Sequence, residues 1–347
     1  MFLDLSLLLF FLAIASDAAV ETKSGCQTKC GNVSIPYPFG IGRNCSIDDW
    51  ADITCNTTFD PPKPFILSGL EVVQISQSEV RIKNIISSIC FSQSGALIQR
   101  ETARVNLSGT PYTFSSTKNK IKAIGCDNLL RVELNSNNYG IMCTTFCNQR
   151  EDVILDSCSG RGCCDMPIPR GLKAFATGLV AFQNHTTVWS FDPCGAAFLG
   201  EDSMNNFKIS DLSDLTLVRQ IPTVLNFAVG NETCRDARKN GATYACKGNH
   251  SFCYDSVDGS GYLCSCNIGY QGNPYVENSC QDVNECEDPM HNPCDGICVN
   301  TAGSYYCSCP KDSYGDGRKD GTHCTKRIKQ FPIIRVTLGI YNYNLFK

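Results

Sequence analysis

Cysteine is the residue that most constrains this chain, because it occupies 24 of the 347 positions. That density is typical of chains whose cysteines form disulfides in an oxidising compartment. The spacing is irregular up to Cys194 and becomes a regular six-Cys rhythm from Cys234 onward, with twelve cysteines on each side of the change. The pairing of the first twelve stays open, because connectivity cannot be deduced from sequence. These are Cys26, Cys30, Cys45, Cys55, Cys90, Cys126, Cys143, Cys147, Cys158, Cys163, Cys164 and Cys194.

The N-terminus indicates the secretory pathway. An apolar run from Leu5 to Ile14 is followed by small residues, which predicts a signal peptide over residues 1–18. No later stretch has the eighteen apolar residues that a membrane helix needs, so we expect membrane attachment only if a longer product supplies the helix. Seven Asn-x-Ser/Thr sequons predict N-glycosylation at Asn32, Asn44, Asn56, Asn106, Asn184, Asn231 and Asn249.

Short β-branched runs, over residues 71–75, 79–86 and 130–134, predict a mainly β chain. The expected fold class is disulfide-rich and mainly β, with a Cys-rich β N-terminal region followed by two small modules. The expected divisions after the signal peptide are a Cys-rich domain over 26–131, a second Cys-rich β region over 132–233, modules over 234–280 and 282–324, and a basic, apolar tail over 325–347.

The two C-terminal modules repeat one order of six cysteines, and each ends in Cys-x-Cys followed by a longer loop. A zinc site is the competing interpretation of Cys-x-Cys, but a regular secreted module with few His favours disulfides. Both modules resemble the EGF family. The resemblance implies the pairs Cys234–Cys253, Cys246–Cys264, Cys266–Cys280, Cys286–Cys298, Cys294–Cys307 and Cys309–Cys324.

The second module also resembles the calcium-binding EGF signature, through Asp282–Cys286 and Cys298–Cys307. Calcium takes six to eight oxygen ligands, which carboxylates, an amide and backbone carbonyls can supply. The alternative is that the two acidic residues are only linker charges. In the first module a sequon stands in the first ligand position, so we expect no calcium there. The ligands that the resemblance implies are the side chains of Asp282, Glu285 and Asn300 and the backbone oxygens of Val283, Thr301 and Ser304.

Four segments resemble the extracellular part of plant wall-associated receptor kinases: Cys30–Gly42, which resembles the start of their galacturonan-binding domain, and then Gly162–Leu172, Ser190–Phe198 and Gly269–Tyr275. The family continues into a membrane helix and a Ser/Thr kinase, whereas no Gly-rich phosphate loop, His-Arg-Asp or Asp-Phe-Gly motif occurs in this sequence. We therefore expect a secreted, cell-wall protein that is not an enzyme. The four His residues show no spacing to a nucleophile or a metal cluster either.

The resemblance implies binding of pectin or oligogalacturonides, which are polyanions. Residues 26–131 carry 11 Lys/Arg against 8 Asp/Glu, the right sign for such a partner. Alternating cations could line exposed strand faces that meet the polymer's carboxylates, although a solvated face is the plainer interpretation. The candidate glycan contacts are Arg81, Lys83, Lys118, Lys120 and Lys122.

Tyr37 and Phe39 could stack on sugar rings, but aromatic residues in a Pro-rich segment more often serve packing. The alternative function is a calcium-dependent scaffold for extracellular protein interactions without glycan binding. No nucleic-acid partner is expected.

Overall fold

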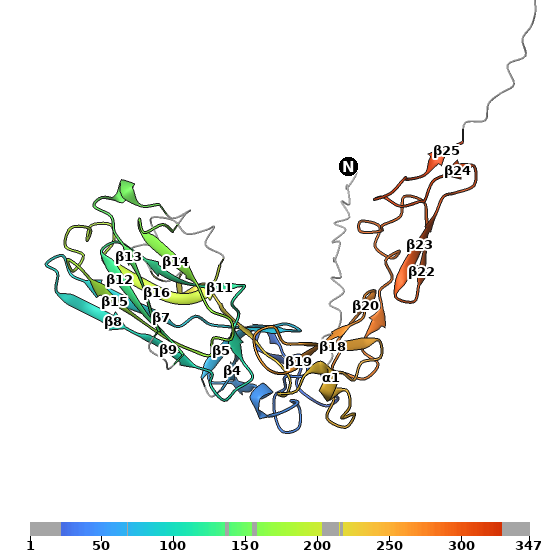
Figure 1. Ribbon diagram of the computed structural model, residues 1–347, viewed down its shortest axis with the longest axis horizontal. Helices are drawn as coiled ribbons and strands as arrows, with labels where there is room; N and C mark the ends of the chain where they lie inside the picture. Colours follow the sequence, from blue (N-terminus) through green and yellow to red (C-terminus); the bar gives the residue numbers. More distant parts are fainter. Residues whose placement is uncertain are drawn as a thin grey trace, which may run out of the picture. The chain divides into compact units, whose positions relative to one another are not determined.

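The computed structural model describes residues 22–67, 69–135, 139–154, 158–202, 215 and 218–327. The chain divides into two compact units, one ending at Gln281 and the other beginning at Asp282. The strands of both units are labelled in Figure 1. The predicted signal peptide and the predicted tail from residue 328 onward lie outside the described residues.

The first unit is built on three antiparallel sheets. The six-stranded sheet has the order β10 (Thr113–Phe114), β17 (Thr223–Asn226), β6 (Glu79–Ile82), β5 (Leu70–Ile75), β4 (Lys63–Ile66), β3 (Thr54–Asn56). The five-stranded sheet has the order β14 (Cys163–Pro167), β11 (Asn119–Ile124), β16 (Cys194–Glu201), β7 (Ile86–Phe91), β8 (Leu97–Glu101). The four-stranded sheet has the order β13 (Tyr139–Thr145), β12 (Asn128–Leu134), β15 (Ala174–Ala181), β9 (Ala103–Asn106).

Smaller elements complete this unit. A two-stranded ribbon joins β1 (Lys29–Cys30) to β2 (Val33–Ser34), and another joins β18 (Ser251–Asp255) to β19 (Tyr262–Cys266). The other short elements are β20 (Tyr270–Gln271), α1 (Cys234–Ala237) and the 3₁₀ turns η1 (Asp49–Ala51), η2 (Arg150–Asp152) and η5 (Val218–Gln220). The mainly β, disulfide-rich fold class is confirmed.

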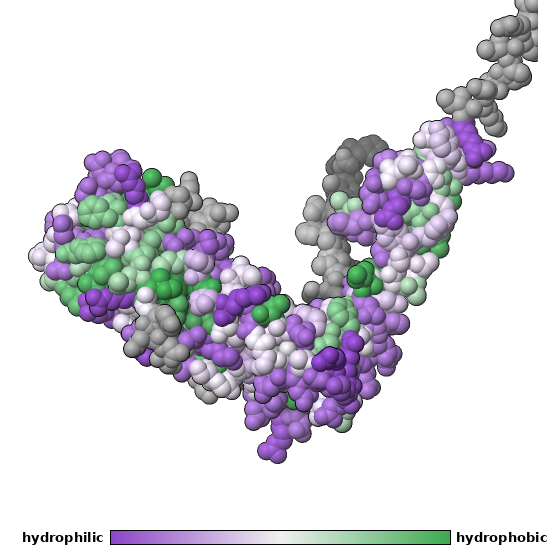
Figure 2. Space-filling model, in the orientation of Figure 1, coloured by the Kyte–Doolittle hydropathy of each residue, from purple (hydrophilic) through white to green (hydrophobic). Residues whose placement is uncertain are grey.

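The four- and five-stranded sheets pack face to face, with β15 lying against β7 and β16. The Ser87 hydroxyl of β7 donates to the Thr177 carbonyl of β15 at 2.7 Å. In β12, Leu130, Val132 and Leu134 are buried while Arg131 faces solvent, as expected for a strand with one face on a core. Figure 2 shows apolar surface remaining over this part of the first unit.

Two expectations from sequence are corrected here. The strand expected over 79–86 is two strands, because the chain leaves the six-stranded sheet after Ile82 and enters the five-stranded sheet at Ile86, with Asn84 buried between them. The division expected between residues 131 and 132 falls inside β12, which pairs along its length with β13 and β15. It therefore does not separate two domains.

All 24 cysteines lie within the described residues and none of them is free. In the last two modules the structure has the six pairs that the EGF resemblance implies. The first twelve pair as Cys26–Cys45, Cys30–Cys55, Cys90–Cys194, Cys126–Cys147, Cys143–Cys164 and Cys158–Cys163.

The first EGF-like module, predicted as a separate domain, belongs to the same compact unit as the sheets. Val229 and Tyr262 exchange backbone hydrogen bonds at 2.8 and 3.1 Å. Asn273, which is buried, donates from Nδ2 to the carbonyl of Tyr37 at 2.5 Å. Two motifs that are 236 residues apart in sequence are thus in direct contact.

The second unit is a small module held by three disulfides. Its hairpin pairs β22 (Ile297–Thr301) with β23 (Ser304–Ser308), and a shorter ribbon pairs β24 (Ser313–Tyr314) with β25 (Thr325–Lys326). The strand β21 (Gln281–Asp282) includes the last residue of the first unit and the first residue of the second. Disulfides stabilise such a module because it is too small to bury a large apolar core.

Candidate calcium and polysaccharide sites

Two of the predicted calcium ligands, Asp282 and Asn300, are in contact in the second unit. The Asp282 carboxylate accepts hydrogen bonds from Asn300 Nδ2 at 2.7 Å and from the backbone N–H of Gly303 at 2.5 Å. Gly303 has a φ of 75°, which glycine adopts readily and which allows the tight turn between the hairpin strands. Thr301 pairs with Ser304 across this turn, and its hydroxyl donates to the Ser304 carbonyl at 2.8 Å.

The chemistry of this donor set fits calcium. Glu285 Oε2 is buried and has no hydrogen-bond partner, although a buried carboxylate oxygen normally has one. The oxygen and nitrogen of the Asn300 amide are interchangeable by a flip, so either atom can lie on the side where Asp282 stands. Among the described residues no group of three or more His, Cys, Asp or Glu could hold a metal. This set would contribute only two carboxylates, with amide and carbonyl oxygens making up the rest.

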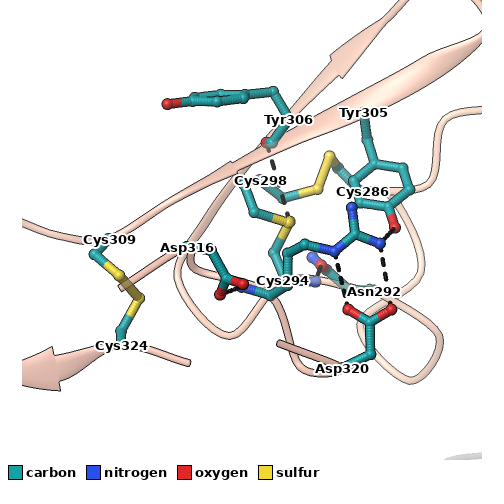
Figure 3. Close-up of a disulfide and its surroundings, with 12 residues drawn as sticks. Cys286, Asn292, Cys294, Cys298, Tyr305, Tyr306, Cys309, Asp316, Asp320 and Cys324 are labelled. Atoms are coloured by element: carbon teal, nitrogen blue, oxygen red, sulfur yellow. Dashed lines mark hydrogen bonds and ion pairs between the residues drawn. A yellow bond between two sulfur atoms is a disulfide. The ribbon is translucent and has the colours of Figure 1, made fainter. Parts of the chain in front are cut away.

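Arg318 contacts Tyr305 of the β22–β23 hairpin, which the sequence did not predict. Its guanidinium donates from Nη2 to the Tyr305 hydroxyl at 2.7 Å and from Nε to Asp320 at 2.9 Å, and Tyr305 and Asp320 lie together in Figure 3. Backbone N–H groups of Arg318 and Thr322 bind the Asp316 carboxylate and hold its pKa below its usual value. Tyr305 is the cross-strand neighbour of Asn300, a predicted calcium ligand.

The candidate glycan contacts are all in ion pairs. Arg81 makes a bidentate pair with Glu201, at 2.7 and 3.1 Å, and lies 3.5 Å from Glu79. Glu201 raises the pKa of Arg81, and Arg81 in turn lowers that of Glu201. Lys118 lies 2.6 Å from Glu79, and Lys83 lies 3.6 Å from a Glu71 oxygen.

The other two lysines share one carboxylate. Lys120 contacts Asp165 at 2.9 Å and Asp202 at 3.0 Å, and Lys122 contacts Asp202 at 2.6 Å. The Lys122 side chain is only 2% exposed, so the expectation of one exposed face through the three alternating lysines is wrong for this residue. The hydrogen bond from Lys122 is the main cause of the lowered pKa of Asp202. The five candidate cations are paired with five carboxylates, one of which, Glu71, also lies 3.1 Å from Lys63.

The aromatic candidates differ from each other. Phe39 is fully buried against Trp50 and Phe227, with ring centroids at 5.8 and 5.1 Å, and so serves packing. Tyr37 is half-buried, and the ammonium of Lys23 lies 5.8 Å from its ring centroid. The Asn residues of six predicted sequons are exposed, and Asn56 is half-buried.

Comparisons with known proteins agree with this organisation. Residues 26–86 match the wall-associated receptor kinase galacturonan-binding domain, and residues 282–324 match the calcium-binding EGF domain. Wall-associated receptor kinase 2 of Arabidopsis thaliana is 34% identical over 327 residues, which cover 92% of this chain and 42% of the relative. Wall-associated receptor kinase 5 of the same plant is 36% identical over 320 residues, covering 90% and 42%. No solved structure matches the chain.

The fold and these matches define an extracellular, cell-wall class of disulfide-bonded protein with a galacturonan-binding and a calcium-binding EGF domain. Within that class, the chain is homologous over about 90% of its length to the wall-associated receptor kinases. It spans about 42% of the length of these relatives, and the domains that match are binding domains, with no catalytic domain among them. Among the described residues, no helix is long and apolar enough to cross a bilayer.

Proposed function

We propose that this chain binds cell-wall pectin through its first unit and calcium through its second. The observation that carries the pectin proposal is the match of residues 26–86 to a galacturonan-binding domain. The homologous relatives are named as wall-associated receptors, which is consistent with a wall polysaccharide as ligand.

For calcium, the proposed ligands are those that the EGF resemblance implies. The Asp282 and Glu285 carboxylates, the Asn300 amide and the carbonyls of Val283, Thr301 and Ser304 would provide six oxygens, within the range that calcium takes. The buried, unpartnered Glu285 oxygen supports this assignment, because an ion would satisfy it. The bound ion would hold the first residues of the unit against the β22–β23 hairpin.

For pectin, the five proposed cations differ in whether the polymer can displace their carboxylate partners. Lys83 and Lys118 each make a single ion pair. Their side chains are 49% and 42% exposed, more than those of the other three cations. Exposed ion pairs contribute only about 0–1 kcal/mol, so galacturonate can compete for these two cations at little cost. Arg81 and Lys122 would instead hold the acidic side chains in place.

A second candidate function is a calcium-dependent protein-interaction scaffold. It is favoured by one observation, the exposed apolar side chains of Ile297, Val299 and Tyr306 on the hairpin next to the proposed calcium site. Exposed apolar groups that gather on one element often mark protein contacts.

Binding of the purified chain to immobilised polygalacturonate tests the proposal, with and without calcium and with fully methyl-esterified pectin as the uncharged comparison. We expect binding to polygalacturonate only, and weaker binding as salt rises to about 0.15 M and above, where the screening length is about 8 Å. Lys83→Gln with Lys118→Gln should weaken binding. The control Lys311→Gln with Lys319→Gln, an equal charge change in the second unit, should not.

Equal binding to the esterified polymer, or no binding to either by folded protein, would contradict the pectin proposal. Calcium-dependent capture of an extracellular protein, without polygalacturonate binding, would favour the scaffold instead.

A further inference from the structure

The first unit has an open groove of about 570 Å³ that contains none of the proposed pectin-binding cations or calcium ligands, although part of its lining lies within the 26–86 match. Its walls come from four separate parts of the chain: Asp48, Asp49 and Trp50 on and before η1, the loop 108–111 before β10, Lys173 before β15, and Asn231 before α1. A smaller hollow of about 50 Å³ shares Lys173 and Asn231 and extends to Ser260 in the first EGF-like module.

Trp50 is held rigidly at this groove. Its ring lies 5.8 Å from those of Phe39 and Tyr112, both edge-on, and 5.7 Å from that of Phe227, tilted by 34°. The Tyr112 hydroxyl also donates to the Trp50 carbonyl at 3.0 Å. A half-buried indole fixed on several sides offers the groove an apolar surface that needs no reordering before a ligand packs on it.

The polar groups of the groove suit hydroxyl-rich ligands. Asp48 and Asp49 are exposed, and neither forms an ion pair within the described part of the chain. Their carboxylates accept hydrogen bonds, while the Ser260 hydroxyl and the Asn231 amide can both donate and accept. Lys173 donates to the Thr110 carbonyl, and burial lowers its pKa.

The charge of the groove excludes the ligand proposed above. Two carboxylates stand against one ammonium, so the groove is acidic and repels a polymer of galacturonate. An apolar ring face combined with acceptors for neighbouring hydroxyls matches a pyranose sugar without a carboxylate.

We propose that this groove binds a neutral sugar residue of an oligosaccharide. The apolar face of the pyranose packs on Trp50, and Asp48 and Asp49 accept hydrogen bonds from its hydroxyls. Asn231 lies at the rim, with its Oδ1 3.5 Å from the Ser260 hydroxyl. Because Asn231 is also a predicted N-glycosylation site, the groove should be studied both in the glycosylated chain and in Asn231→Gln.

Trp50 itself provides the probe, because Trp189 is the only other tryptophan. The indole of Trp189 donates to the Phe91 carbonyl at 2.9 Å, away from the groove, so Trp189→Phe leaves Trp50 as the single fluorophore. We expect a saturable change in its fluorescence with at least one of cellohexaose and galactohexaose, whose sugar residues are pyranoses. Hexagalacturonate should give no such change.

Two variants locate the binding. Asp49→Asn should weaken the neutral sugar about tenfold, as expected for loss of a hydrogen bond to a charged group. The matched control Glu277→Gln, another exposed carboxylate of this unit, should have no effect. In the protein with both tryptophans, calorimetry of Trp50→Phe, which keeps an aromatic ring in the packing, should also show weaker binding. Near-ultraviolet circular dichroism checks the fold of each variant.

The proposal is wrong if none of the neutral sugars binds to folded protein in either glycosylation state. It is also wrong if their binding is unchanged in Asp49→Asn and Trp50→Phe, or if hexagalacturonate alone alters Trp50. Polygalacturonate binding, measured separately, is expected to survive in both variants, so failure of the pectin proposal would not be mistaken for failure of this one.

Discussion

Removing the carboxylate of Asp202 should destabilise the first unit far more than removing the ammonium of Lys122 that it pairs with. The Lys122 side chain is 2% exposed and its Nζ lies 2.6 Å from Asp202, its one ion-pair partner in the described ranges. Asp202→Asn therefore leaves a buried cation without a counter-charge, whereas Lys120 keeps Asp165. Breaking a buried pair from one side costs ~3–5 kcal/mol, and we expect about 3 kcal/mol because Asp202 is 41% exposed.

Lys122→Met should behave differently, because it removes the buried charge and keeps an apolar side chain of similar length. Such replacements are often nearly neutral. The double variant should consequently be more stable than Asp202→Asn alone. Urea unfolding followed by tryptophan fluorescence measures all three. Equal destabilisation by the two single variants would refute the claim that the buried, unpaired ammonium causes the loss of stability. If a fully stable Lys122→Met instead lost polygalacturonate binding, Lys122 would be a ligand contact.

The same pair predicts the sign of a pH effect. The pKa of Asp202 is lowered in the folded protein, mainly by Lys122, so the stability it contributes is fully present above the unfolded pKa of about 4. That contribution is lost as pH falls through the lower, folded value. The difference in unfolding free energy between wild type and Asp202→Asn should thus shrink as the medium is acidified from about pH 6 to about pH 3.

Three further predictions concern other parts of the chain. Glu285→Gln should weaken calcium binding by about tenfold or more in isothermal titration, because one of the two proposed carboxylate ligands loses its charge. The control Glu287→Gln, at an exposed position nearby, should leave calcium binding unchanged, and equal effects of the two variants would contradict the ligand assignment. Asn273→Ala should cost about 1–3 kcal/mol in urea unfolding, since it removes the buried amide that donates to the Tyr37 carbonyl, and an unchanged midpoint would refute that contact. Replacing Cys90 and Cys194 together by Ala opens a loop of 104 residues and should cost about 2–5 kcal/mol, which a stable, reversible double variant would disprove.

The sequence predicts the fold where information is local. Alternating apolar residues identify the strand over 130–134, and the spacing of the last twelve cysteines identifies two modules. It does not predict that the first module packs into the larger unit, because the contacts responsible join residues such as Asn273 and Tyr37 that are 236 positions apart. The break of the 79–86 run into two strands also depends on which sheet each half joins, a tertiary property.

The candidate sites divide in the same way. The calcium ligands can be proposed from sequence because they lie in two short segments, 282–285 and 300–304, and the second of these is the turn of one hairpin. The cations could also be found from sequence, but their neutralisation could not, since Glu201 lies 120 positions from Arg81 and Asp202 lies 80 from Lys122. Alternation along a strand indicates which side chains share a face, and it gives no information on the charges that tertiary structure places opposite them.

The three proposed ligands depend on different physical interactions, and this makes their assignments separable. Polygalacturonate is held by charge that salt screens, calcium by oxygen ligands in the second unit, and a neutral sugar by an aromatic face and hydrogen bonds on which salt has little effect. Lys83 and Trp50 share no hydrogen bond or ion pair among the residues that the structure describes, so their variants should act independently on the two sugars. The test is a double-mutant cycle that combines the Lys83 and Trp50 variants and measures the binding free energy of each sugar. A coupling energy above about 0.5 kcal/mol would mean that a single surface binds both sugars, and the acidic groove would then need a different occupant.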